Sequence, residues 1–267
     1  MSLLLKVINT FLSFFGFQIV KISSSGSKKT QHGTLDYNNL PTITKASKDG
    51  KLTGFEPQKL EKYSLNQFEL MFGEPGKGLS NSNFDNKMIQ LGQEGELNFA
   101  KSLQKKNLLN RLVTFWSVHN LGIGDEKVPA DVDCVIVSGN TIWLIDLKLY
   151  ASGDVVYRSD KDFLYTIDIA TGSLVGKPKK MSHNMKFAQE KFSKKFENLL
   201  RYYKLETRVV LMPTRKGAGQ IDKVYWPGNI PAITLEDMLL ELEQQPPFKD
   251  TIGGQMIRQT FSLLLKR

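Results

Sequence analysis

Two runs of β-branched and aromatic residues, joined by a short turn, constrain the fold of this chain most strongly. The first run is DVDCVIV at 131–137, and the second is TIWLIDLKLY at 141–150. Residues of this kind favour strands because they fit a pleated, half-buried surface. The Gly139-Asn140 pair between the runs is typical of a tight hairpin. The sequence therefore predicts two antiparallel strands that are adjacent in one sheet.

The hairpin carries three aspartates and one lysine at positions that the turn brings together. A two-residue loop places Asp133 opposite Asp146, and Asp131 opposite Lys148. A four-residue loop keeps this register, whereas a three-residue loop shifts it by one residue. Because side chains alternate between the faces of a strand, Asp146 and Lys148 share one face of theirs.

Two directly opposed carboxylates need compensation, since like charges at this distance repel and the flanking residues are strongly apolar. A divalent cation held by Asp133 and Asp146 is the simplest solution, with Mg²⁺ as the expected ion and Mn²⁺ as the alternative. One of its waters would attack a phosphodiester, and Lys148 would lower the pKa of that water or stabilise the negative charge on the phosphate. The competing interpretation is an ordinary hairpin in which Asp131 neutralises Lys148.

Segments on both sides of the hairpin indicate a mixed α/β sandwich with a central sheet. Helical spacing runs through 86–106, and a strand-like run follows at 112–118. Downstream, the patterns predict a basic helix at 182–203, a buried strand at 207–214, a short strand at VYWPG and a capped helix at 233–245. Upstream, the segment 60–72 is predicted as a helix that packs on the main domain.

The positive charge of the chain is concentrated in one segment. The chain has 36 Lys and Arg against 27 Asp and Glu, a net charge of +9. Between residues 177 and 216, twelve Lys and Arg accompany three Glu, an excess equal to that of the whole chain. Such a segment binds phosphates without reading base sequence, so we expect nucleic acid, DNA rather than RNA, as the partner. A solvated cationic helix is the alternative. The residues expected to bind nucleic acid are Lys180, Lys186, Lys191, Lys194 and Lys195.

Three motifs in this order resemble a known family. They are GQEGELNFAKSL, DVDCVIVSGNTIWLIDLK and SHNMKFAQEKF. Together they resemble the nuclease-related domain, NERD, a branch of the PD-(D/E)XK superfamily with the restriction-endonuclease-like fold. The resemblance covers roughly residues 86–243, and ITLEDML resembles the closing helix of the family. The individual matches are Gly92, Gly95 and Glu96 in the first helix, Asp133 in the first strand, Asp146 and Lys148 in the second, and Asn184, Met185 and Ala188 in the later helix.

The resemblance implies a restriction-endonuclease-like mixed sheet flanked by helices, and metal-dependent cleavage of nucleic acid. It implies that Glu96, Asp133, Asp146 and Lys148 are catalytic, with the three acids as metal ligands. The chain departs from the family at two positions. Cys134 stands where members often have His, and Asp146 stands where Glu is more usual. Neither change removes an acid or the lysine.

Glu96 also stands out from the helical pattern alone. Phe99, Ala100 and Leu103 lie on its side of the helix, and a carboxylate on an apolar face needs a role or a partner. It is either a metal ligand, a base that positions water, or a surface glutamate at the edge of the stripe. Glu94 takes its place if the glycine-rich segment has another register. The expected supporting residues are Gln189 and Asp131.

Composition divides the chain into four regions: an amphipathic helix at 1–22, an irregular extension at 23–85, the nuclease-like domain at 86–245 and a basic C-terminal helix or tail at 246–267. The first helix could dock on the protein, lie in a membrane surface through residues 3–20, or span the bilayer. A lone cysteine cannot form an internal disulfide, so we expect a cytoplasmic protein, membrane-associated if that helix binds lipid. The alternatives to a nuclease are an inactive nucleic-acid-binding module and a membrane-associated factor on the same fold.

Overall fold

A computed structural model describes most of the chain from Asn86 onward and three short segments before it. The described residues are 41–43, 55–57, 68–77, 86–119, 131–151, 153–213 and 219–265. The amphipathic helix expected at 1–22 lies outside them, as does most of the extension. Among the described helices, none is long and apolar enough to cross a membrane.

A mixed seven-stranded sheet forms the centre of the molecule, in the order β12-β13-β10-β6-β5-β4-β3. β6, β10 and β13 run parallel, whereas β4, β5 and β6 form an antiparallel meander. The strands are β3 (Met71–Phe72), β4 (Val113–Val118), β5 (Val132–Ser138), β6 (Thr141–Ala151), β10 (Lys204–Pro213), β12 (Tyr225–Trp226) and β13 (Ile230–Thr234). The expected mixed α/β sandwich with a central sheet is therefore present.

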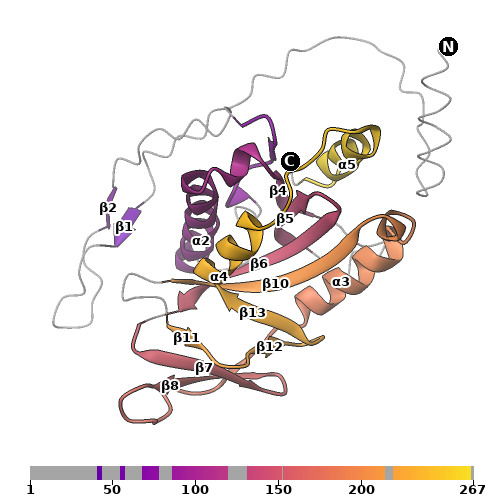
Figure 1. The fold of residues 1–267 in the computed structure, drawn as a ribbon. Helices are drawn as coiled ribbons and strands as arrows, with labels where there is room; N and C mark the ends of the chain where they lie inside the picture. Colours follow the sequence, from indigo (N-terminus) through magenta and orange to yellow (C-terminus); the bar gives the residue numbers. More distant parts are fainter. Residues whose placement is uncertain are drawn as a thin grey trace, which may run out of the picture.

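Helices cover both faces of this sheet (Figure 1). One face packs against α2 (Asn86–Lys105), the 3-10 turn η4 (Leu108–Asn110) and α4 (Leu235–Glu243), which bury Phe99, Leu103 and Met238. The other face packs against α3 (Asn184–Lys195) and α5 (Ile252–Ser262), which bury Phe192 and Phe261. Gly95 lets α2 approach β6 closely, because a Cβ there would already touch Leu149.

A second, four-stranded sheet in the order β11-β7-β8-β9 lies below the central sheet in Figure 1. It comprises β7 (Val155–Asp160), β8 (Phe163–Asp168), β9 (Lys179–Lys180) and β11 (Gln220–Ile221). Val155, Tyr157 and Leu164 join it to the core on the α3 face. β1 (Pro41–Ile43) and β2 (Phe55–Pro57) form a separate antiparallel pair.

The predicted hairpin register is confirmed over the paired part of β5 and β6. Five residue pairs, from Ser138–Thr141 to Cys134–Ile145, follow the two-residue loop. Gly139 has φ +50°, and a Cβ there would lie 2.5 Å from Pro246 Cγ, so the turn requires glycine.

Several predicted helices differ from those observed. Met71–Phe72, expected in a helix, is strand β3, because it pairs in parallel with the edge of β4. The helix expected at 233–245 begins at Leu235, since Ile233 and Thr234 belong to β13 and Thr234 caps the helix. The helix expected at 182–203 spans only Asn184–Lys195 and is followed by the turn η5 (Leu199–Arg201). The C-terminal helix α5 contains one charged side chain, Arg258, so it is not basic along its length.

Candidate active site

The two central strands separate just beyond the Cys134–Ile145 pair, and Asp133 lies at this point. Its Oδ2 accepts a hydrogen bond of 2.7 Å from the backbone N–H of Leu147. The paired residues of β5 and β6 end here, and the Asp133 side chain accepts the Leu147 N–H in place of a backbone carbonyl. This bond brings the Asp133 carboxylate next to the backbone of the residue that follows Asp146.

Asp146 and Lys148 project from the same side of β6, as their spacing predicted. Their neighbours Ile145 and Leu147 pack on the α2 face, so the pair points to the other side of the sheet. Asp146 is 9 % exposed, and Lys148 Nζ lies 2.6 Å from its Oδ2. This contact is a close ion pair between the ammonium and the carboxylate.

Asp131, which the ordinary-hairpin interpretation pairs with Lys148, makes a different contact. Its Oδ1 lies 2.9 Å from Nδ1 of His119, and both side chains are about half exposed. The close counter-ion of Lys148 is Asp146 instead. The ordinary-hairpin interpretation is therefore wrong about the partner of Lys148.

Glu96 approaches this cluster from α2 and is only 3 % exposed. Its Oε2 accepts a hydrogen bond of 2.7 Å from the backbone N–H of Gly76. The charges of Asp133, Asp146 and Lys148 all act on Glu96, so four residues from α2, β5 and β6 share one electrostatic environment. Glu94, the alternative candidate, is half-buried on α2 and interacts with Lys101.

Burial and mutual repulsion disfavour the ionised forms of two of these acids. Burial, followed by the charge of Asp133, holds the pKa of Glu96 well above its usual value, and the Gly76 N–H only partly opposes this. Burial and the charge of Asp146 raise the pKa of Asp133 to about 7. Burial lowers the pKa of Lys148, but Asp146 and Asp133 outweigh it and leave that pKa above its usual value.

Cys134 lies beside this cluster, fully buried on the α2 face. Burial and the charges of Glu96 and Asp133 raise the pKa of its thiol well above the usual value. A thiol that stays protonated is a poor nucleophile and a poor metal ligand. The chemistry of the site therefore rests on its carboxylates and on Lys148. Among the described residues, no three His, Cys, Asp or Glu side chains are already arranged around a metal-sized site.

The expected nucleic-acid-binding lysines lie on β9 and α3. Lys180 and Lys194 are exposed, whereas Lys186, Lys191 and Lys195 are partly buried. Lys186 lies 3.9 Å from Glu190, and Lys195 lies 5.8 Å from the centre of the Phe196 ring, where burial lowers its pKa.

The C-terminal end of α3 lies far from the acids along the sheet. It leads through η5 to Lys204, which begins β10 beside Thr141, five residues before Asp146 and seven before Lys148 on β6. At about 3.3 Å per residue, Thr141 is roughly 16 Å from Asp146 and roughly 23 Å from Lys148 along the strand. Gln189 is half-buried on the same helix, and its position neither supports nor opposes a role in the site.

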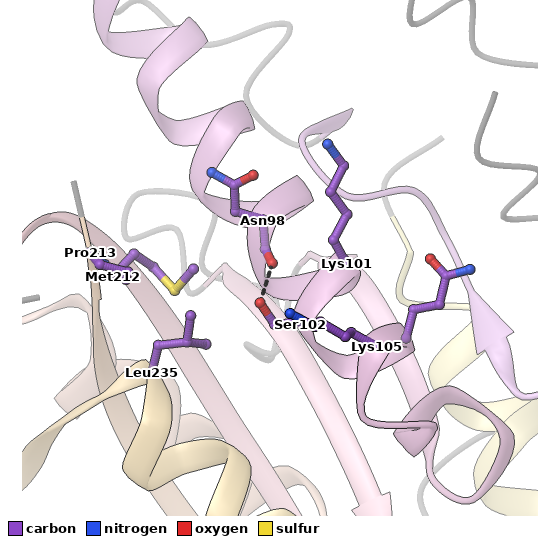
Figure 2. Close-up of a pocket in the computed structure, with 8 residues that line it drawn as sticks. Asn98, Lys101, Ser102, Lys105, Met212, Pro213 and Leu235 are labelled. Carbon is purple, nitrogen blue, oxygen red and sulfur yellow. Dashed lines mark hydrogen bonds between the residues drawn. The ribbon is translucent and has the colours of Figure 1, made fainter. Parts of the chain in front are cut away.

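A hollow that the sequence did not predict lies between α2 and the end of β10 (Figure 2). It has a volume of about 600 Å³, and α2 contributes Asn98, Lys101, Ser102 and Lys105, while Met212 and Leu235 form its apolar side. The polar residues recur at helical spacing, a signal that also fits a solvated helix face. None of the residues that line this hollow belongs to the acid cluster, so the two are separate.

A scan against protein families found one match. Residues 91–212 match the family described as nuclease-related domain, NERD. The matched segment contains Glu96, Asp133, Asp146 and Lys148, and it ends within β10. No curated protein and no solved structure matches the chain.

Proposed function

Because residues 91–212 form a nuclease-related domain, we propose that this chain is a metal-dependent nuclease that hydrolyses phosphodiester bonds, with DNA as its preferred substrate. One observation carries the proposal. Asp133, Asp146 and Lys148 come together where β5 and β6 separate, and the buried Glu96 joins them from α2. An acidic cluster with an adjacent lysine is the donor set that cation-assisted phosphoryl chemistry needs.

The residues present fit a hard divalent ion. All three candidate ligands are carboxylates, whose oxygens Mg²⁺ and Mn²⁺ accept. Because the pKa values of Glu96 and Asp133 are raised, added positive charge nearby would favour the ionised form of both carboxyls. Asp133, Asp146 and Glu96 would hold the ion, with Mg²⁺ favoured and Mn²⁺ able to replace it.

The bound ion supplies polarisation of the attacking water and partial neutralisation of the phosphate. The protein residues do the rest. Lys148 can move its ammonium from Asp146 toward a phosphoryl oxygen and stabilise the charge that develops there in the transition state. The Leu147 N–H holds the Asp133 carboxylate in a fixed orientation. The lysines of α3 and β9 bind the phosphate backbone without sequence preference, at a distance of several nucleotides from the cut.

A second candidate function, nucleic-acid binding without cleavage, is favoured by the Lys148–Asp146 ion pair. This pair neutralises one acid within the chain itself, and among the described residues no metal-sized group of three ligands is preformed. In that case the fold and the basic residues would bind nucleic acid, and the acids would only stabilise the fold.

Cleavage assays distinguish the two functions. Plasmid, linear duplex, single-stranded DNA and RNA are incubated with the full chain in Mg²⁺, Mn²⁺ or EDTA. We expect metal-dependent cutting that falls at least about a hundredfold in Asp146→Asn and in Lys148→Met. Asp160→Asn, at an exposed aspartate of β7, is the matched control and should cut normally. If no substrate is cut, or if Asp146→Asn cuts like the wild type, the chain is not a nuclease that uses this site.

A further inference from the structure

The segment 68–77 precedes the matched domain in the sequence but is built into the same sheet. β3 pairs with β4, Phe72 stacks on Phe115 with ring centres 5.3 Å apart, and the Ser117 hydroxyl donates to the Glu74 carbonyl at 3.1 Å. Gly73 has φ +77°, and a Cβ there would lie 2.5 Å from the Trp116 carbonyl oxygen. Contacts with β4 therefore hold the segment both before Gly73, through Phe72, and after it, through Glu74.

Gly76 is the point at which this segment reaches the acid cluster. It is buried, has φ +81°, and donates its N–H to Glu96 Oε2 at 2.7 Å. Its carbonyl accepts a hydrogen bond of 3.3 Å from Gln93 Nε2, one turn earlier on α2. A Cβ on Gly76 would lie 3.0–3.2 Å from atoms of Gln93, so a side chain would push this peptide away from the helix. Both the backbone conformation and the space favour glycine.

We propose that Gly76 is a positioning residue of the active site, whose N–H holds Glu96 in the orientation that binds the divalent ion. The inference rests on the proposed nuclease function and extends the site beyond residues 91–212. Because Glu96 Oε2 accepts the Gly76 N–H, Oε1 is the oxygen that would bind the ion. The same bond fixes the orientation of the Glu96 carboxylate relative to the other acids.

The test measures Mn²⁺ binding to the full chain by isothermal titration calorimetry, together with cleavage across a range of Mn²⁺ concentrations. Groups that orient a metal ligand typically change metal affinity by 10- to 100-fold, so Gly76→Ala should raise the Mn²⁺ dissociation constant by roughly tenfold or more. Saturating Mn²⁺ should restore much of the cleavage rate, and a circular-dichroism spectrum in EDTA like that of the wild type separates this effect from a folding defect. Gly172→Ala is the matched control, because Gly172 has φ +66° but nothing within 4 Å of a Cβ, and Mn²⁺ binding should not change.

Gln93→Ala leaves the glycine itself in place and removes the bond to the Gly76 carbonyl, so it provides a milder second variant. We expect its Mn²⁺ dissociation constant to rise about two- to fivefold. If Gly76→Ala fails to fold, this measurement tests the inference in its place. Unchanged Mn²⁺ affinity in folded Gly76→Ala, or in Gln93→Ala if the first variant does not fold, overturns the inference and leaves the proposed function intact. A wild-type chain that binds no Mn²⁺ overturns the proposed function and this inference with it.

Discussion

The replacement Asp133→Asn should make the metal-free protein more stable at alkaline pH, although it removes a candidate metal ligand. Burial and the nearby Asp146 raise the pKa of Asp133 from 3.8 to about 7. Below pH 3.8 the carboxyl is protonated in both the folded and the unfolded chain, so it has no effect on stability there. Between the two values the folded chain holds a proton that the unfolded chain has lost, so stability falls as the pH rises.

The magnitude follows from the size of this shift. Each pH unit between the two pKa values costs about 1.4 kcal/mol, so the full shift corresponds to at most about 4 kcal/mol above pH 7. Asp133 is only partly buried, and solvent screens part of its interaction with Asp146. We therefore expect Asp133→Asn to gain about 2 kcal/mol over the wild type at pH 8 and almost nothing at pH 4.5. The asparagine Oδ1 can still accept the Leu147 N–H.

Urea unfolding in EDTA at a series of pH values measures this difference directly. The wild type should lose stability from pH 4.5 to 8 more steeply than Asp133→Asn, and the two curves should differ by about 2 kcal/mol at the alkaline end. Added Mg²⁺ should stabilise the wild type and leave the variant unchanged. Parallel curves for the two proteins in EDTA would refute the conclusion that burial and Asp146 raise the pKa of Asp133.

Three further outcomes follow from the structure. Lys194→Ala should weaken DNA binding and reduce the slope of log affinity against log salt by about one, as measured by fluorescence anisotropy, whereas exposed Lys249→Ala should not. Gly139→Ala should destabilise the fold by about 2 kcal/mol or more in urea unfolding, because it adds a clash with Pro246 to the strain of a positive φ. A loss of stability no greater than that of Gly172→Ala would contradict the clash. Phe192→Ala should cost about 3–5 kcal/mol, because its ring packs against Phe196 and Phe261; a loss under about 1 kcal/mol would mean that α3 is not anchored there.

Local patterns predicted the central hairpin well because its register depends on short-range rules. Alternation places one set of side chains on each face, and the Gly139-Asn140 turn limits the pairing, so the observed Cys134–Ile145 pair follows from the sequence. The same patterns failed at 60–72. Helical spacing there gave no sign that Met71–Phe72 would pair with β4, because strand pairing depends on a partner that lies elsewhere in the chain.

The sequence by itself predicted the match of residues 91–212 to a nuclease-related domain, the hairpin register and the presence of Glu96, Asp133, Asp146 and Lys148 in one domain. Only the tertiary structure decided how their charges are paired. The spacing placed both Asp131 and Asp146 near Lys148. In the structure, where the strands separate beyond Cys134, Lys148 forms its ion pair with Asp146. Asp131 contacts His119 instead. The Gly76–Glu96 bond joins residues 20 positions apart, through a glycine whose conformation and burial depend on the docking of β3. Periodicity fixes the face on which a side chain lies, but burial and pairing depend on contacts between segments that are distant in the chain.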